Sequence, residues 1–358
     1  MIRAPILFRV DAAPRLGWEY LSRCLTLAAA IQRRRRPAYF LSQLEPASLG
    51  LTIKRGGNDW LDAGSPAGTA DDLDELVQEV RRLRPAAVIV DSPDVKEEYL
   101  SGLRGTGVLV VSLDSLAHTV FSSHLIVNPL LGLSRESYEA ARGSQLLLGA
   151  RYALVRPEIR RQRPARAQEP AQPFRAIVAL GDDDPHNQSG ALAKCLLNCP
   201  KVDRVDVLVR PYHRDLDKLK ALAETSQERL EIISESGEAP FRIARCHFAV
   251  SAGNAWSLEL ACVGVPQILI VQSETHWPTA QRLEEEGSAT CLGWQANVSP
   301  QTIRQAVADL LGDALERQAM ARCGRKLIDG RGPDRLVTAL ELLLHPSRHV
   351  QSAAAIAA

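Results

Sequence analysis

The stretch HFAVSAGNAWSLELACVGVPQILIVQ, residues 247–272, contains the pattern that decides the fold. Two short apolar runs, at 247–253 and 267–272, enclose a segment that begins a helix near Asn254 or Ala255. Continuous apolar strands separated by helices are typical of parallel sheets that are covered on both faces. The stretch therefore predicts a strand–helix–strand unit of an α/β protein.

The same alternation extends over the chain. Further apolar runs lie at 6–10, 86–91, 108–114, 124–129, 176–181, 205–210 and 230–234. The segment 156–173 is rich in Pro, Arg and Gln, and its lack of periodicity indicates a linker. We therefore predict two doubly wound, Rossmann-like domains, at 1–155 and 174–345, with a frayed Ser- and Ala-rich tail at 346–358.

Composition excludes several classes of protein. The chain has 358 residues, 46% of them hydrophobic, with a formal net charge of +1, so no global attraction to nucleic acid is expected. No run approaches the ~20 apolar residues of a membrane span. The seven cysteines lack CxxC spacing, which favours reduced thiols, no metal site and a cytoplasmic protein. The one basic run, Arg33–Arg36, reads as a solvated helix end.

The turn in the opening stretch is the strongest candidate binding site. Ligands of doubly wound sheets bind beyond the carboxyl ends of the strands. Ser251, Gly253, Asn254 and Ser257 surround a helix start, whose free N–H groups and positive dipole end suit a diphosphate. Glu259 lies about one turn further on, where a carboxylate can accept hydrogen bonds from ribose hydroxyls. The alternative is a tight strand-to-helix packing turn.

Two weaker candidates follow other strands. Gly181 permits close approach of the backbone to a ligand. The acids at 182–184 after it repel a phosphate unless a metal intervenes, so Asp184 is better explained as part of a helix-capping cluster. In the loop after the first strand, Gly17 precedes a helix start, which is either an anion site or an ordinary strand-to-helix turn.

Several motifs in order resemble a known family. The first, R-x-D-x-S-x-x-I-G-x-G-H-x-x-R-C-L-x-L-A, is matched here by Arg9, Asp11, Gly17, Arg23, Cys24, Leu25, Leu27 and Ala28. Later matches are LLLGARYALVRPEI at 146–159, Gly181 with Asp184-Pro185, the turn and helix at 251–266, and Asp329-Gly330-Arg331-Gly332 with Arg335. The chain resembles the UDP-sugar hydrolase of the pseudaminic acid pathway, which is related to the peptidoglycan UDP-GlcNAc transferase and to spore-coat polysaccharide proteins.

The resemblance implies a GT-B fold, with two Rossmann-like domains facing an interdomain cleft that holds a UDP-sugar. It implies no cofactor and no metal, and a role in surface polysaccharide or nonulosonic acid biosynthesis. The first domain would supply the sugar or acceptor side and the catalytic loop. The second would bind the nucleotide, through Gly181, Asp184 and the turn and helix at 251–260. In GT-B folds a last helix often crosses back onto the first domain.

The chain departs from the family where the chemistry should be. The family's catalytic histidine is Tyr20 here, and the glycine before it is Glu19. A phenol with a pKa near ~10 is a poor base at neutral pH. The family's Asn-Gln pair corresponds to Thr275-His276. The candidate catalytic residues are therefore Asp11, Glu19, Tyr20 and His276, with Glu19 or His276 as the replacement base.

Three functional readings stay open. The first is a nucleotide-sugar enzyme, either a hydrolase or a glycosyltransferase. The second is a protein that binds a nucleotide-sugar on the same fold without turning it over. The third is an epimerase of the GT-B type. The sequence identifies neither the sugar nor an acceptor, nor any partner enzyme.

Overall fold

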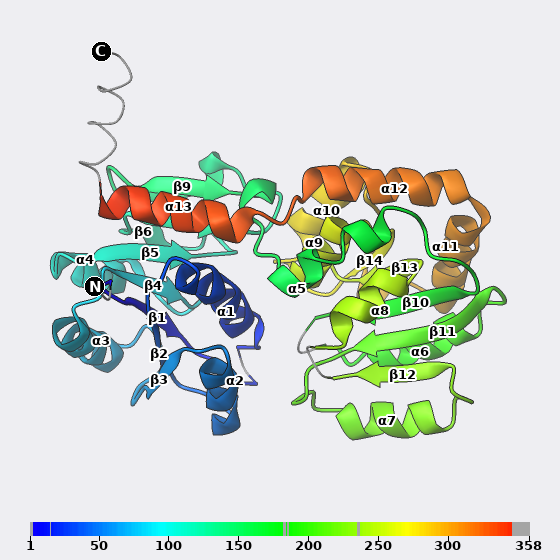
Figure 1. Cartoon of the computed structure of the whole chain (residues 1–358), viewed down its shortest axis with the longest axis horizontal. Helices are drawn as coiled ribbons and strands as arrows, with labels where there is room; N and C mark the ends of the chain where they lie inside the picture. The colour runs from blue at the N-terminus through cyan, green and yellow to red at the C-terminus, as the bar shows by residue number, and fades with distance from the viewer. Residues whose placement is uncertain (1–2, 15, 182–183, 185, 235–236, 346–358) are drawn as a thin grey trace, which may run out of the picture. The chain divides into compact units, whose positions relative to one another are not determined.

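A computed structural model describes residues 3–14, 16–181, 184, 186–234 and 237–345. The chain forms two compact units, each with its own parallel sheet (Figure 1). Unit 1 comprises Met1–Pro129, Leu133–Leu154 and Arg331–Ala358, and unit 2 comprises Leu130–Gly132 and Val155–Gly330. The expected tail at 346–358 lies outside the described residues. None of the described helices is long and apolar enough to cross a membrane.

Unit 1 contains a seven-stranded sheet with the order β3-β2-β1-β4-β5-β7-β9, and all neighbouring strands are parallel. Its strands are β1 (Ile6–Val10), β2 (Ala38–Ser42), β3 (Asp59–Asp62), β4 (Ala87–Asp91), β5 (Leu109–Leu113), β7 (Leu125–Asn128) and β9 (Gln145–Leu148). The short strands β6 (Val120–Phe121) and β8 (Glu139–Ala140) pair separately. The expected runs at 6–10, 86–91, 108–114 and 124–129 are confirmed as strands.

Helices cover both faces of this sheet because successive strand residues point to opposite sides. Ile6 and Phe8 belong to a core beneath α1, α2 and α13, whereas Leu7 belongs to a second core beneath α3 and α4. The helices are α1 (Glu19–Gln32), α2 (Gly50–Arg55), α3 (Ala70–Leu83), α4 (Glu97–Gly105) and α13 (Gly332–Leu344), with short 3₁₀ turns η1 (Ala47–Leu49), η2 (Arg135–Ser137) and η3 (Ala150–Tyr152).

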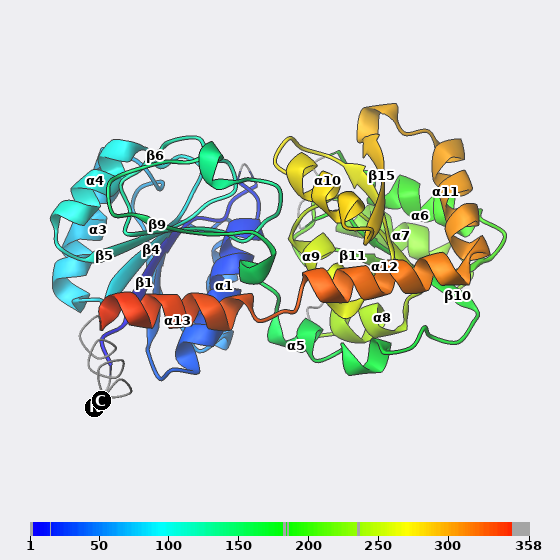
Figure 2. The ribbon, with the colours of Figure 1, turned by 90° about the horizontal axis from the view of Figure 1, so that it is seen from above.

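The last helix, α13, belongs to unit 1 and packs beside α1 (Figure 2). Our expected second domain, 174–345, therefore extends too far. The basic run after α1 contributes to this packing, because Arg33 pairs with Asp334 at 2.7 Å and Arg36 with Glu341 at 2.6 Å. Arg36 is buried, so only part of the run is a solvated helix end.

Unit 2 contains a six-stranded parallel sheet with the order β12-β11-β10-β13-β14-β15. Its strands are β10 (Phe174–Ala179), β11 (Val202–Leu208), β12 (Leu230–Ile233), β13 (Phe248–Ser251), β14 (Gln267–Val271) and β15 (Ala289–Trp294). The helices are α5 (Pro157–Arg160), α6 (Ser189–Leu197), α7 (Leu216–Glu224), α8 (Ala239–Arg245), α9 (Ala255–Val263), α10 (Trp277–Glu285), α11 (Pro300–Gly312) and α12 (Ala314–Leu327), with η4 (Pro164–Arg166) and η5 (Gln295–Asn297).

Both faces of the unit 2 sheet are buried. Val178 and Val250 lie in a core with residues of α6, α7 and α11. The alternate positions Ile177 and Ala249 are also buried, and α8 and α9 contact these strands. The expected strand–helix–strand unit at 247–272 is thus β13, α9 and β14.

The segment 156–173 differs from the expected linker. It contains α5 and η4 and is part of unit 2. Its arginines hold it in place, because Arg163 donates hydrogen bonds to the carbonyl oxygens of Cys262 and Ile328. A segment without apolar periodicity has become ordered through long cationic side chains that reach buried carbonyl groups.

Candidate functional site

The carboxyl edge of the unit 2 sheet carries the candidate site. β10 has β11 on one side and β13 on the other, so the direction in which the strands follow one another reverses between β10 and β13. Such a switch point is where doubly wound sheets bind their ligands. The chain places Gly181 just after β10 and the turn from Ser251 to Asn254 at the end of β13.

The turn after β13 is closed by its own side chains. The N–H of Gly253 donates to Ser257 Oγ at 2.9 Å, Ser257 Oγ donates to Ser251 Oγ, and Ser251 Oγ donates to Gln267 Oε1. Both serines are fully buried. Ser251 and Ser257, which we expected at the ligand, therefore fix the shape of the turn in this structure.

Asn254 joins the two turns at the switch point. Its Oδ1 accepts the N–H of Trp256 as the cap of α9, and its Nδ2 donates to the carbonyl oxygen of Leu180. A Cβ on Gly181 would lie 2.9 Å from Asn254 Nδ2, which explains a glycine there. In the described part of the chain, the N–H groups of Asn254 and Ala255 have no hydrogen-bond partner. The first turn of α9 is thus able to bind an anion.

Asp184 is a helix cap. Its fully buried carboxylate accepts the N–H groups of Gln188 and Ser189 at the start of α6, at 3.0 and 2.7 Å. This arrangement agrees with the capping explanation that we favoured for the acidic cluster. The neighbouring acids at 182 and 183 lie outside the described residues.

Further polar atoms that are buried without partners among the described residues belong to loops at the carboxyl edge of the unit 2 sheet. His213 Nε2, Gln272 Oε1 and His276 Nδ1 are buried and have no hydrogen-bond partner among the described residues. They belong to loops that follow β11 and β14, at the same carboxyl edge. Leaving such atoms unsatisfied costs free energy, so a ligand or ordered water is expected at each.

Burial keeps both imidazoles neutral. It lowers the pKa of His213, and it lowers the pKa of His276 to about 4. A group with so low a pKa accepts a hydrogen bond at neutral pH but is a weak base. Sequence reasoning singled out His276 and missed His213 and Gln272. The position of Gln272 directly after an apolar strand was the signal that could have revealed it.

Glu259, expected at the ribose, is held by Arg156 within unit 2. Its Oε1 accepts the N–H and Nε–H of Arg156 at 3.0 and 2.8 Å, and its Oε2 accepts Nη2–H at 2.6 Å. The Arg156 guanidinium also lies 4.4 Å from the centre of the Trp256 ring. Sequence reasoning gave no sign of this pairing, because the partners are separated by 103 positions.

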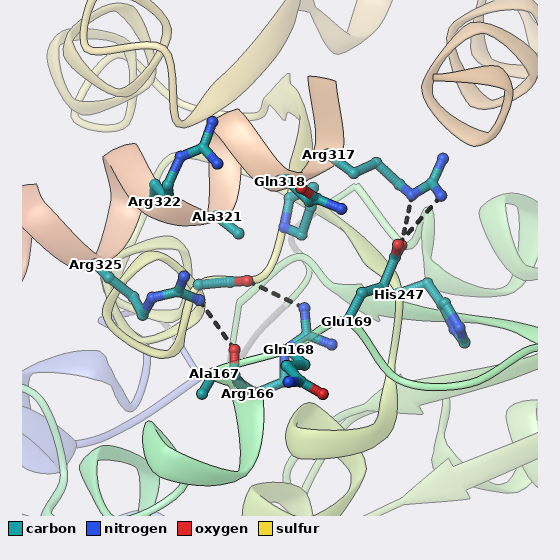
Figure 3. A pocket seen from close by; sticks show the side chains of 12 residues that line it. Arg166, Ala167, Gln168, Glu169, His247, Arg317, Gln318, Ala321, Arg322 and Arg325 are labelled. Carbon is teal, nitrogen blue, oxygen red and sulfur yellow. Dashed lines mark hydrogen bonds and ion pairs between the residues drawn. The ribbon is translucent and has the colours of Figure 1, made fainter. Parts of the chain in front are cut away.

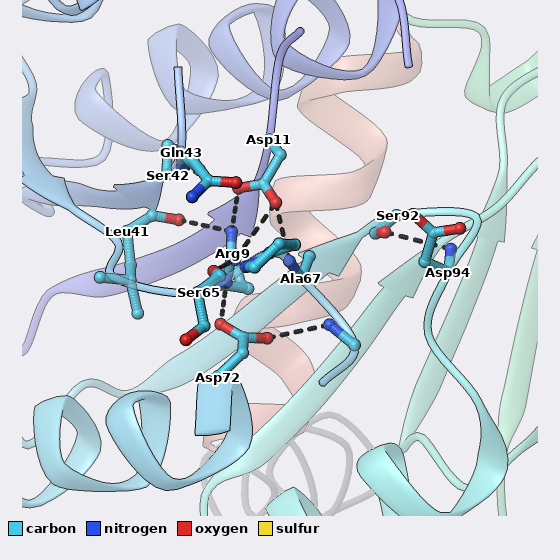
Figure 4. Close-up of polar contacts among 12 residues, drawn as sticks. Arg9, Asp11, Leu41, Ser42, Gln43, Ser65, Ala67, Asp72, Ser92 and Asp94 are labelled. Atoms are coloured by element: carbon cyan, nitrogen blue, oxygen red, sulfur yellow. Dashed lines mark hydrogen bonds and ion pairs between the residues drawn. The ribbon is translucent and has the colours of Figure 1, made fainter. Parts of the chain in front are cut away.

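Asp11, a candidate catalytic residue, lies in a buried charged network of unit 1 (Figure 4). Its carboxylate accepts hydrogen bonds from Arg9 and from the backbone N–H groups of Gln43 and Ala67. Arg9 is fully buried and also pairs with Asp72, at 2.5 Å. In this structure Asp11 compensates the charge of Arg9 and anchors two loops.

The other unit 1 candidates lie at the start of α1. Gly17 has a φ of +83°, which suits glycine, and Glu19 is the first residue of the helix. Burial raises the pKa of Tyr20 to about 12, although the nearby Arg23 lowers it. Arg23 forms a two-bond ion pair with the buried Asp91. Tyr20 is therefore protonated at neutral pH and is an even poorer base than a free phenol.

Two parallel-sheet units of this topology, each with helices on both faces, constitute the GT-B fold of glycosyltransferases and related epimerases. Solved structures with this fold align with nearly the whole chain. They include MurG of Acinetobacter baumannii, the spinosyn rhamnosyltransferase SpnG complexed with thymidine diphosphate, and the UDP-GlcNAc 2-epimerase of Neisseria meningitidis bound to UDP-GlcNAc. Their identities are 13%, 18% and 11%, with TM-scores of 0.64, 0.64 and 0.63; each alignment covers 94% of this chain and 99%, 100% and 99% of the respective structure.

A scan against protein-family models finds no match. Among curated proteins, the spore coat polysaccharide biosynthesis protein SpsG of Bacillus subtilis (strain 168) is 22% identical over 225 residues. The match covers 61% of this chain and 65% of SpsG, which is less than two thirds of the relative. The chain is thus similar over part of its length to a polysaccharide biosynthesis protein.

Proposed function

We propose that this chain binds a nucleoside-diphosphate sugar, with its diphosphate at the first turn of α9, and acts on it in polysaccharide biosynthesis. The observation that carries the proposal is the pair of unpartnered N–H groups of Asn254 and Ala255 at the β10/β13 switch point. They point to an anion, because a helix start combines free N–H groups with a positive dipole end. The unpartnered atoms of His213, Gln272 and His276 would bind the remaining polar groups of the ligand.

The comparisons support the same ligand class. Two of the solved relatives were determined with a pyrimidine nucleoside diphosphate or its sugar derivative, and the curated relative takes part in polysaccharide synthesis. We extend these properties to this chain as part of the proposal, with a UDP-sugar as the first substrate to test. Charge that develops on the leaving diphosphate would be stabilised by the start of α9.

We favour transfer of the sugar to an acceptor over hydrolysis. The UDP-sugar hydrolases that the chain resembles activate water with a histidine, and Tyr20 stands at that position here. Burial raises the pKa of Tyr20 to about 12. A protein that transfers a sugar gains nothing from activating water. Hydrolysis of a pseudaminic-type UDP-sugar is the second candidate, supported by the motif matches around α1, and it would require Glu19 as the base. Binding without turnover is the third.

Removal of one N–H group tests the binding site. Ala255 is the first residue of α9 and Asn254 before it is extended, so Ala255→Pro fits the helix start while it deletes the N–H. We expect calorimetry to show UDP binding weakened at least about tenfold, which corresponds to a charge-assisted hydrogen bond of roughly 1.5 kcal/mol. Ala314→Pro, at the exposed first position of α12, is the matched control. Equal UDP affinities in both variants and the parent protein would refute the site.

A turnover measurement distinguishes the three candidate functions, which are transfer, hydrolysis and binding without turnover. Phosphorus NMR of a UDP-amino sugar incubated with the protein should show free UDP only after an acceptor is added, if the chain is a transferase. Release of UDP without an acceptor would support the hydrolase instead. Tight UDP binding with no release under either condition would support a binding protein.

A further inference from the structure

A second cavity lies at the opposite, amino edge of the unit 2 sheet (Figure 3). Its volume is about 270 Å³. It is lined by the segment 166–169 before β10, by His247 before β13, by Gly264 and Pro266 before β14, and by one side of α12. Because carboxyl and amino ends of parallel strands lie at opposite edges, this cavity is separate from the switch-point site.

Positive charge dominates the lining of this cavity. Four arginines line it, namely Arg166, Arg317, Arg322 and Arg325. The lining contains a single carboxylate, Glu169, which pairs with Arg317 at 2.5 Å. The other three guanidinium groups form no ion pair with a carboxylate in the described part of the chain, although Glu169 lies close enough to attract Arg166.

Arg166 is the most deeply buried of the arginines that line the cavity. It is only 3% exposed, and it donates hydrogen bonds to the carbonyl oxygens of Cys246 and Gly264. Its Nε–H is buried and has no partner among the described residues. A buried positive charge without an ion-pair partner in direct contact is costly, and an anion in the cavity would compensate it.

The neighbouring arginines repel one another. Arg325 donates to the backbone carbonyl oxygen of Arg166 at 3.0 Å, and both residues line the cavity. Burial lowers the pKa of Arg325, and nearby cations lower it further; they are Arg163, Arg166 and Arg322. The Arg322 side chain is exposed and forms neither a hydrogen bond nor an ion pair with any described residue. Bringing like charges together without a counter-ion is unfavourable.

We propose that this amino-edge cavity binds a small phosphate-bearing anion, held by the guanidinium groups of Arg322 and Arg325 and favoured by the buried positive charge of Arg166. Guanidinium groups bind phosphate oxygens through two parallel hydrogen bonds, which suits a site built from arginines and lacking lysine. The size of the cavity limits the ligand to a small molecule, either an inorganic phosphate or a phosphorylated metabolite. The site is independent of the nucleotide-sugar that we assign to the carboxyl edge.

Titration with inorganic pyrophosphate tests the proposal. The protein is first saturated with UDP, so that the switch-point site is occupied, and pyrophosphate binding is then measured by calorimetry. We expect Arg322→Gln and Arg325→Gln each to raise the pyrophosphate Kd at least about fivefold, and UDP affinity to stay within twofold. Lys326→Gln is the matched control, since Lys326 is an exposed cation on the same helix and does not line the cavity.

The outcomes separate the possible ligands. A tighter Kd for glucose 1-phosphate than for pyrophosphate would identify a phosphorylated metabolite, and the reverse order an inorganic phosphate; both support the site. Citrate that binds more tightly than either phosphate compound would overturn the assignment to phosphate. Pyrophosphate affinity that is the same in the two arginine variants as in Lys326→Gln would overturn the site itself.

Discussion

The carboxylate of Glu259 on α9 is bound by Arg156, which precedes α5, through both the side chain and the backbone N–H. Arg156 packs its guanidinium over the Trp256 ring on the same helix. The pair is largely buried, so removal of either charge is expected to be costly. Glu259 thus fixes the segment before α5 against α9, whether or not it also contacts a ribose.

Glu259→Gln should destabilise unit 2. The change removes the carboxylate that pairs with the largely buried guanidinium group of Arg156, and breaking a buried ion pair typically costs about 3–5 kcal/mol. Urea denaturation followed by circular dichroism measures the difference in unfolding free energy. The control is Glu285→Gln, which removes an exposed partner of Arg282 and should cost less than about 1 kcal/mol. Losses of the same size in both variants would contradict the importance of the buried pair.

The ribose role of Glu259 can be tested separately. If its carboxylate also accepts a hydrogen bond from the ribose 2′-hydroxyl, Glu259→Gln should weaken UDP binding at least about tenfold. For 2′-deoxy-UDP, which lacks this hydroxyl, the variant and the parent protein should then bind with nearly the same affinity. Calorimetry with both nucleotides measures this difference. Equal losses for the two nucleotides would leave Glu259 with its structural role alone.

Gly253→Ala should destabilise the turn at the switch point. Gly253 has a φ of +80°, and an added Cβ would lie 2.8 Å from the carbonyl oxygen of His276. Strain of this kind costs about 1–3 kcal/mol, and a shift of the turn would also misplace the start of α9. We expect a lower thermal midpoint together with weaker UDP binding. Gly312→Ala, which has open space at the end of α11, should be neutral or slightly stabilising.

Tyr20→Phe should retain turnover, whereas Glu19→Gln should abolish hydrolysis if Glu19 is the base. Tyr20 is protonated at neutral pH because burial raises its pKa to about 12, and phenylalanine preserves the ring beneath Arg23. Release of UDP measured between pH 6 and 9 compares the two variants. A large loss of rate in Tyr20→Phe would show that the hydroxyl takes part in the reaction after all.

His276 should make the protein less stable at acid pH. Its pKa is about 4 in the folded chain against an ordinary 6.5, so between these values the unfolded chain binds a proton that the folded chain does not. The free energy of unfolding therefore falls as the pH is lowered from 6.5 toward 4, and the loss due to His276 is on the order of 2 kcal/mol. Urea denaturation at pH 5 and pH 7 measures this loss. The difference in unfolding free energy between the two pH values should be smaller in His276→Asn than in the parent protein. His345→Asn, with an exposed ring, should behave like the parent protein.

Several features of the fold followed from local sequence patterns. The apolar runs predicted nine strands, most of them largely buried, namely β1, β4, β5, β7, β10, β11, β12, β13 and β14. The strands β2, β3, β9 and β15 escaped notice, because three of them are partly exposed and carry polar residues, as in DWLD at 59–62. The same reasoning misread 156–173, where the ordering forces are hydrogen bonds from Arg163 and Arg166 to distant carbonyl groups.

For the candidate site, too, local sequence predicted some features and tertiary contacts decided the others. The sequence by itself determined the turn at Gly253 and the helix start after it, because positive φ angles and capping depend on adjacent residues. Only the tertiary structure decided that Arg156 neutralises Glu259, that Arg9 engages Asp11, and that α13 packs in unit 1. The physical reason is that burial and charge pairing depend on residues far apart in the chain, and local patterns carry no record of them.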